Sequence, residues 1–273
     1  MLFFISYCLC KAQTIEKKYT NFELVTNAKN VKEYNLSGIT NDQQINFEQV
    51  DKLFLANKLK SRKSNEYSFN AAGYLVELKT YYTNPKVLNQ GVYSYDDKNL
   101  LLEIIEKESP IDTINYSDYL KVKITRNNDE VTKTWTYAKE DTVYIEKFRL
   151  KNNYIVKENA PNSNNIRRKI EFDKNYNRLS GKIILASGEK LTWKNIYTFY
   201  PNGVVKSKQC LWTDLLTKTT ETFFPNGLIK TETSKNKVLK YIYKYDQQGN
   251  WIYKMIYKNK KPNKLLKREI SYF

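Results

Sequence analysis

The chain has 273 residues, enough to bury a core, and its 41% hydrophobic content excludes a disordered polypeptide. It carries 46 Lys and Arg against 29 Asp and Glu, a formal net charge of +17. It contains no histidine, which excludes Ser-His-Asp and Cys-His catalysis and every histidine-ligated metal site. The aromatic share of 14%, with 23 tyrosines, favours strands, because aromatic side chains fit a pleated, half-buried surface.

The first residues are typical of the end of a secretory signal. Residues 1–12 are mostly apolar, and the small residues Cys10 and Ala12 would stand at −3 and −1 of a cut before Gln13. No basic residue precedes the apolar run, so we expect the recorded start to truncate the signal. We therefore predict export to the periplasm, the outer membrane or the medium; a buried N-terminal strand is the alternative.

Residues 13–62 form a non-repeating region. Phe47, Val50, Leu53 and Phe54 have helical spacing, so a short helix is expected there. Farther on, Cys210 would be the one cysteine left after cleavage, and with no base partner it is expected to be a small core residue.

From residue 67 onward a hairpin unit recurs. Alternating apolar or aromatic residues lead into a turn, as in Tyr197-Thr198-Phe199. In most units an apolar residue stands two positions after the turn residue, as Val205 does after Gly203. Pro201 and Pro225 suit the second position of a type I turn, and the glycine after each Pro-Asn can adopt positive φ. The predicted turn positions are Gly73, Asn99, Tyr176, Gly203, Gly227 and Gly249. The gap between Asn99 and Tyr176 is wide enough for degenerate units.

A single hairpin cannot bury its apolar face, so neighbouring hairpins must extend it side by side. The sequence thus predicts a mostly β protein: an elongated, twisted antiparallel sheet of consecutive hairpins with a short mixed N-terminal region. We expect a first repeat segment at 63–158 and a second, basic one at 159–273. The polar residues 159–165 are expected to form a loop between them.

These units resemble the tyrosine–aspartate (YD, Rhs-like) repeats of exported bacterial proteins. Tyr245-Asp246-Gln247-Gln248-Gly249-Asn250-Trp251 carries the resemblance best. The two Pro-Asn-Gly units look equally like MORN-variant repeats, and the C-terminal segment is similar to the ends of such proteins in the Bacteroidetes group. The resemblance covers about residues 67–273. Large Rhs proteins wrap a toxin in a shell, and we expect too few repeats here to close one.

The positive charge is concentrated in the second half. Residues 1–150 have a net charge of +1, and residues 151–273 have +16. A one-sided basic half suggests an anionic partner, and codon bias is the alternative. The candidate contacts are Lys240, Lys244, Lys254, Lys258, Lys260 and Lys261, and the candidate exposed aromatics are Trp251, Tyr253 and Tyr257. Lys240 and Lys244 should share a face opposite Tyr241, Tyr243 and Tyr245.

The sequence shows no glycine-rich phosphate loop and no metal-ligand spacing, so we expect no cofactor, no metal and no catalytic residues. The first functional hypothesis is a non-catalytic exported protein that binds a polymer or partner at the cell envelope. That partner would be an anionic polysaccharide, a membrane surface or a protein; nucleic acid is not expected as the native one. The alternative is an immunity or antitoxin-like protein of a bacterial toxin system.

Overall fold

The protein was studied as a computed structural model, which describes residues 23–24, 28–37, 47–56, 60–83, 86–110, 118–127, 130–137, 140–151, 154–159, 167–172, 177–185, 187–213 and 217–273. These residues form one helix, α1 (Phe47–Leu55), and an antiparallel sheet. The strands are β1 (Ala28–Ser37), β2 (Lys60–Phe69), β3 (Leu75–Thr83), β4 (Lys86–Tyr95), β5 (Leu101–Pro110), β6 (Asp118–Asn127), β7 (Glu130–Tyr137), β8 (Glu140–Lys151), β9 (Tyr154–Asn159), β10 (Arg167–Phe172), β11 (Arg178–Ile184), β12 (Lys190–Phe199), β13 (Val205–Trp212), β14 (Thr217–Phe223), β15 (Ile229–Ser234), β16 (Lys237–Tyr245), β17 (Trp251–Lys258) and β18 (Lys261–Tyr272).

The predicted hairpin turns are present. The amide of Gly203 donates to the carbonyl of Tyr200 at 2.9 Å, and Gly227 donates to Phe224 at 2.9 Å. Both glycines have positive φ, 79° and 83°, which a residue with a Cβ adopts only under strain. The remaining described turns of the series, at 73, 99 and 249, repeat this geometry, and their strands shift register by a bulge at the turn. The prediction at Tyr176 lies outside the described residues.

Side chains of one hairpin bind the backbone of the preceding one beside these turns. The acceptor in each case is the carbonyl two residues past the turn position, where the bulge interrupts the regular ladder. The bonds are Tyr95 Oη to Leu75 O (2.7 Å), Arg126 Nη1 to Leu101 O (2.8 Å), Tyr197 Oη to Arg178 O (2.9 Å) and Tyr243 Oη to Ile229 O (2.9 Å). The recurring tyrosine therefore joins hairpin to hairpin as well as packing on the sheet.

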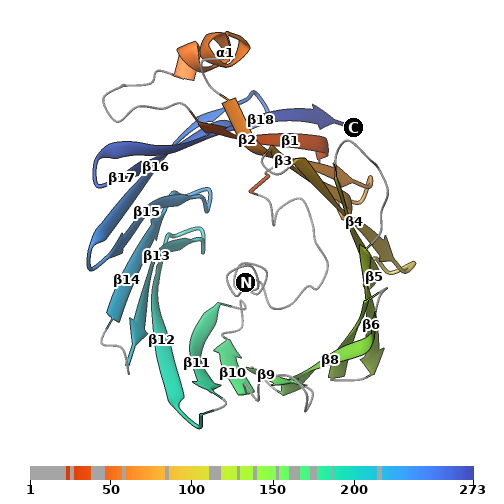
Figure 1. Ribbon diagram of the computed structural model, residues 1–273. Coiled ribbons are helices and arrows are strands. Elements are labelled where there is room, and N and C mark those ends of the chain that lie inside the picture. The colour runs from red at the N-terminus through yellow and green to blue at the C-terminus, as the bar shows by residue number, and fades with distance from the viewer. Residues whose placement is uncertain are drawn as a thin grey trace.

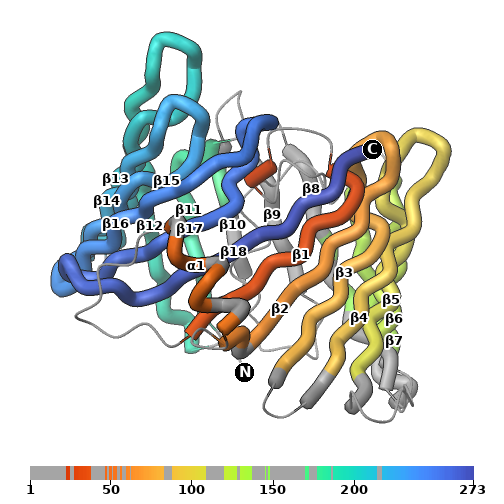
Figure 2. Tube along the Cα trace, turned by 90° about the horizontal axis from the view of Figure 1, so that it is seen from above, coloured from red at the N-terminus to blue at the C-terminus, as the bar shows by residue number. Residues whose placement is uncertain are grey.

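The mostly β, antiparallel fold of consecutive hairpins is confirmed, and the sheet also closes on itself. Each strand from β2 to β17 pairs with the one that follows it in the chain. β1 pairs with both β18 and β2, which joins the two ends of the row (Figures 1 and 2). This ring, in which β1 joins the two ends of the row of hairpins, was not predicted from the sequence. Closure was missed because β1 comes from the non-repeating region. The two predicted repeat segments are joined in one sheet through the β9–β10 pairing.

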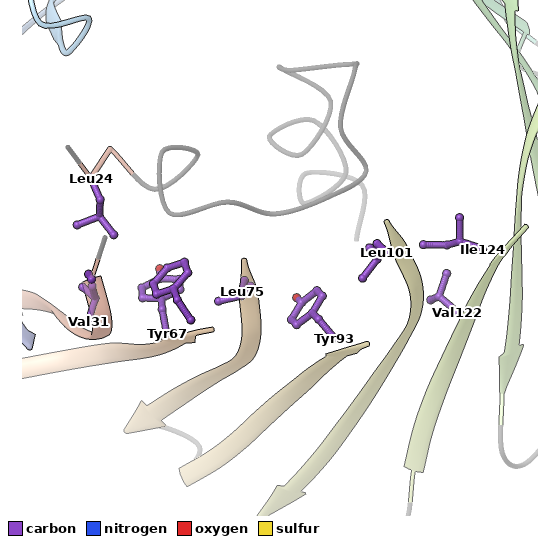
Figure 3. Packing of buried hydrophobic residues seen from close by; sticks show 10 residues of the cluster. Leu24, Val31, Tyr67, Leu75, Tyr93, Leu101, Val122 and Ile124 are labelled. Carbon is purple, nitrogen blue, oxygen red and sulfur yellow. The ribbon is translucent and has the colours of Figure 1, made fainter. Parts of the chain in front are cut away.

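The two faces of the sheet are distinguished by what packs on them. The short described segment before β1 lies inside the ring (Figure 1), and its Leu24 is buried with Val31, Tyr67 and Tyr93 (Figure 3). Helix α1, predicted from its spacing, lies outside, and Val50 is buried against side chains of the opposite face: Leu36, Tyr253, Met255 and Leu265 (Figure 1). The face of Tyr67 is thus the inner face, and the face of Met255 is the outer one.

Two further expectations concern residues that the structure does not describe or describes only in part. The predicted signal, residues 1–12, lies outside the described residues, as does nearly all of the predicted loop at 159–165.

Cys210, expected in the core, is half-buried on the inner-face side of β13, and burial raises the pKa of its thiol.

Candidate binding surface

The outer face of β12–β15 carries rows of hydroxyl and amide side chains. One row runs Thr198, Ser207, Thr222 and Thr231 across four strands and ends at Lys240 on β16. A parallel row contains Gln209, Thr220 and Thr233. Within the first row, Thr198 Oγ1 lies 2.7 Å from Ser207 Oγ, and Thr222 Oγ1 lies 2.6 Å from Thr231 Oγ1. The rows make a continuous polar patch, because directly paired residues of neighbouring strands project to the same face.

Four lysines surround these rows on the same outer face. Lys194 and Lys218 both pair with Leu211 across the sheet, so they bracket one side of the patch. Lys240 and Lys244 lie along β16 on the other side. We call this surface, the seven polar residues together with the four lysines, the lysine–threonine face. Among the described residues none of the four lysines has a carboxylate within ion-pair distance.

The carboxylates of the same strands point the other way. Glu221 on β14 accepts an ion pair from Lys208 at 3.3 Å, and Glu232 on β15 accepts one from Lys237 at 3.0 Å. Both glutamates alternate with the outer-face threonines and so lie on the inner face. On β14 and β15 the charge is thereby sorted: the two glutamates are paired on the inner face, and the lysines beside the polar rows face outward.

The first half shows the opposite arrangement on its outer face. Its strands carry four lysine–glutamate pairs there. They are Lys32–Glu66 (3.1 Å), Lys79–Glu77 (3.0 Å), Lys121–Glu103 (2.8 Å) and Lys147–Glu130 (3.2 Å). The contrast between the halves therefore lies in the placement of acids as well as in their number.

The structure brings together only part of the predicted lysine set. Lys240 and Lys244 belong to the lysine–threonine face, opposite Tyr241 and Tyr243 as the alternation predicts. Lys258, Lys260 and Lys261 are exposed, but they cluster at the β17–β18 turn, which lies at one rim of the ring. Asn259 and Lys260 form that turn with positive φ.

The prediction for Lys254 was wrong. Its side chain is buried on the inner face, where Nζ lies 2.9 and 3.0 Å from the two carboxylate oxygens of Glu23. The same ammonium stands 5.3 Å from the ring centroid of Trp251. An amphipathic lysine in β17 was expected to point outward, but Glu23, from the segment before β1, supplies the buried partner that a charge needs inside.

The prediction of exposed aromatics was also wrong. Trp251 is 1% exposed and Tyr253 is 4% exposed, while Tyr257 is half-buried. The indole Nε1 of Trp251 donates to Glu23 at 2.9 Å on the inner face. Tyr253 packs on the outer face under α1, with its ring 5.7 Å from that of Phe47. Trp251 and Tyr253 are covered on the two faces of β17, so they stabilise the fold and are not exposed to a partner.

A second cluster of charge lies beside Trp251 on the inner face. The guanidinium of Arg268 stacks on the Trp251 ring, 3.5 Å from its centroid, and binds Glu33 at 2.8 Å. Nearby Lys264 is half-buried, and desolvation lowers its pKa, with the charges of Lys254 and Lys63 acting in the same direction. The Arg268–Glu33 ion pair joins β18 to β1, which is the arrangement of a structural site.

The described residues offer little for metal or redox chemistry. Within them no three His, Cys, Asp or Glu side chains are grouped so as to hold a metal ion. In that same part of the chain no helix is long and apolar enough to cross a membrane.

Sequence reasoning missed most of the lysine–threonine face. Lys194 and Lys218 and the seven polar residues were not singled out, although the segments Thr217–Phe223 and Ile229–Ser234 alternate threonine with charged residues. That alternation was a usable signal on β15, where it assigns Thr231 and Thr233 to the face opposite Glu232.

Comparisons with known proteins give no family. No family model matches the chain, and no curated protein matches it. Among solved structures, it is similar to a porin-like protein from Bacteroides uniformis at 10% identity. The alignment covers 90% of this chain and 97% of that one, with a TM-score of 0.44. The resemblance to YD and MORN-variant repeats stays a prediction.

Proposed function

We propose that the protein is a non-catalytic exported repeat protein that binds an anionic polymer or surface at the cell envelope through its lysine–threonine face. One observation carries the proposal. The four lysines of that face have no carboxylate partner among the described residues, while the acids of neighbouring strands are paired on the inner face. Four unpaired cations on one surface create a local positive potential that attracts polyanions.

The location matters because the chain's total charge would give some attraction by itself. The proposal therefore predicts that binding depends on where the lysines lie. A matched pair of variants separates the two effects. The face variant replaces Lys194, Lys218, Lys240 and Lys244 by Gln, and the control variant replaces the ion-paired Lys32, Lys79, Lys121 and Lys147 by Gln.

Both variants lose four positive charges, so they have the same net charge. We would measure the salt concentration at which the full chain elutes from an immobilised polyanion such as dextran sulfate. The face variant should elute at clearly lower salt than the control, because the lysines of the control are already neutralised locally. Equal elution of the two variants, or no retention of the unmodified protein, would overturn the proposal.

A further inference from the structure

Resting on the proposed function, we infer that the partner is an acidic polysaccharide, which lies across β12–β16 along the hydroxyl rows. The rows run perpendicular to the strands, as the cross-strand pairs Thr198–Ser207, Thr222–Thr231 and Thr231–Lys240 show. From Thr198 to Lys240 the first row crosses four strand spacings, about 19 Å at ~4.8 Å each. Consecutive sugars of an extended polysaccharide are separated by a length similar to one strand spacing.

The hydroxyls retain capacity for a ligand. Each hydroxyl has one donor and two acceptor sites, so the bond between Thr198 and Ser207 leaves that pair one donor and three acceptor sites. The bond between Thr222 and Thr231 leaves the same. Thr198 and Thr233 are exposed, and the other residues of the two rows are half-buried. A ligand that itself carries many hydroxyls can use both the donor and the acceptor sites, whereas a carboxylate polymer without hydroxyls can only accept from the one donor that each pair retains.

The apolar content of the face disfavours a lipid bilayer. Ile196 and Val238 are each 46% exposed, but they lie at opposite ends of the second row, on β12 and β16, with Gln209, Thr220 and Thr233 between them. Leu211 on the same face is half-buried and lies between Lys194 and Lys218. Insertion into a bilayer requires a continuous apolar surface, which these three side chains do not make. The combination of hydroxyl rows with lysines on both sides matches a polymer that carries both hydroxyls and carboxylates.

The test separates hydroxyl recognition from charge. Replacing Thr198, Thr222, Thr231 and Thr233 by Val keeps the charge and the β-branched shape but removes four hydroxyls. The control replaces Thr125, Thr132, Thr134 and Thr136 by Val on the outer face of β6 and β7. Binding of the full-length chains would be measured to polygalacturonate, to polyacrylate, which has carboxylates but no hydroxyls, and to vesicles rich in phosphatidylglycerol. Thermal melts would verify that all the variants fold.

We expect the hydroxyl variant to bind polygalacturonate at least about tenfold more weakly than the control, because several hydrogen bonds are lost together. Its binding to polyacrylate should fall much less, because that polymer has no hydroxyl donors with which to use the acceptor sites. Equal affinity of both variants for polygalacturonate, or tighter binding of the unmodified protein to vesicles than to polygalacturonate, would overturn this inference. The proposed function would survive failure of this inference if the unmodified protein bound polyacrylate and vesicles and the face variant, which lacks the four lysines, did not. Failure of the unmodified protein to bind any of the three would overturn both.

Discussion

The Arg268–Glu33 pair should be the strongest single contact across the seam where β1 meets β18. Nε and Nη2 of Arg268 lie 2.9 and 2.8 Å from Glu33 Oε2, and the two side chains are only 5% and 16% exposed. Replacing Arg268 by Met would leave a mostly buried carboxylate without its cation, which typically costs about 3–5 kcal/mol. Loss of the stack on Trp251 adds roughly 0.5–2 kcal/mol.

The double variant Glu33→Met with Arg268→Met should recover most of that loss. Replacing both members of a buried ion pair with apolar residues of similar volume is often nearly neutral. One penalty also disappears, because Nη1 of Arg268 is buried with no hydrogen-bond partner among the described residues. We therefore expect the double variant to lie within about 2 kcal/mol of the unmodified protein.

The assay is urea unfolding of the full chain, followed by tryptophan fluorescence and by circular dichroism. Coincident single transitions are needed before the free energies of the four members of the cycle are compared. The reasoning predicts strong coupling between the two sites. If the loss in the double variant equalled the sum of the two single losses, the sites would be independent and the seam would not depend on this pair.

The other predictions concern turns, tyrosines and export. Gly203→Val and Gly227→Val should each lower the free energy of unfolding by about 1–3 kcal/mol, since both positions have positive φ; unchanged thermal melts would contradict the turn assignment. Burial raises the pKa of Tyr67 and Tyr243 above the ordinary value near 10, so stability should be full below pH ~10 and fall as the pH rises past it. Phe at both positions should flatten that fall in alkaline denaturation curves, and an unaltered slope would exclude these two tyrosines as its cause. Mass spectrometry of the protein from its native cells should find an N-terminus near Gln13; intact Met1 in the cytoplasm would favour the antitoxin-like alternative.

The hairpins could be predicted because their signals are local. Pro201-Asn202-Gly203 contains within three residues what its turn requires, and the Tyr197/Phe199 alternation assigns one face without reference to the rest of the chain. The alternation also placed Lys240 and Lys244 correctly on the face opposite Tyr243.

The errors came from contacts between distant parts of the chain. β1 pairs with β18 from more than 200 residues away, and nothing local in residues 28–37 identifies it as the strand that closes a ring. Lys254 and Trp251 were predicted to be surface contacts from the basic and aromatic residues of β17 alone. Glu23 and α1 cover its two faces, and neither was visible in the repeat pattern.

Closure has a consequence for the order in which the chain folds. A sheet whose strands pair all the way round has no free edge to recruit another chain, which removes a common route to aggregation. That protection is acquired late, because β1 is made early and its partner β18 follows only after the other strands. Until β18 arrives, the nascent sheet exposes one edge at β1 and another at its growing end. Such long-range pairing folds slowly, so this protein should depend on chaperones during synthesis and be most prone to misassociation just before its last strand is added.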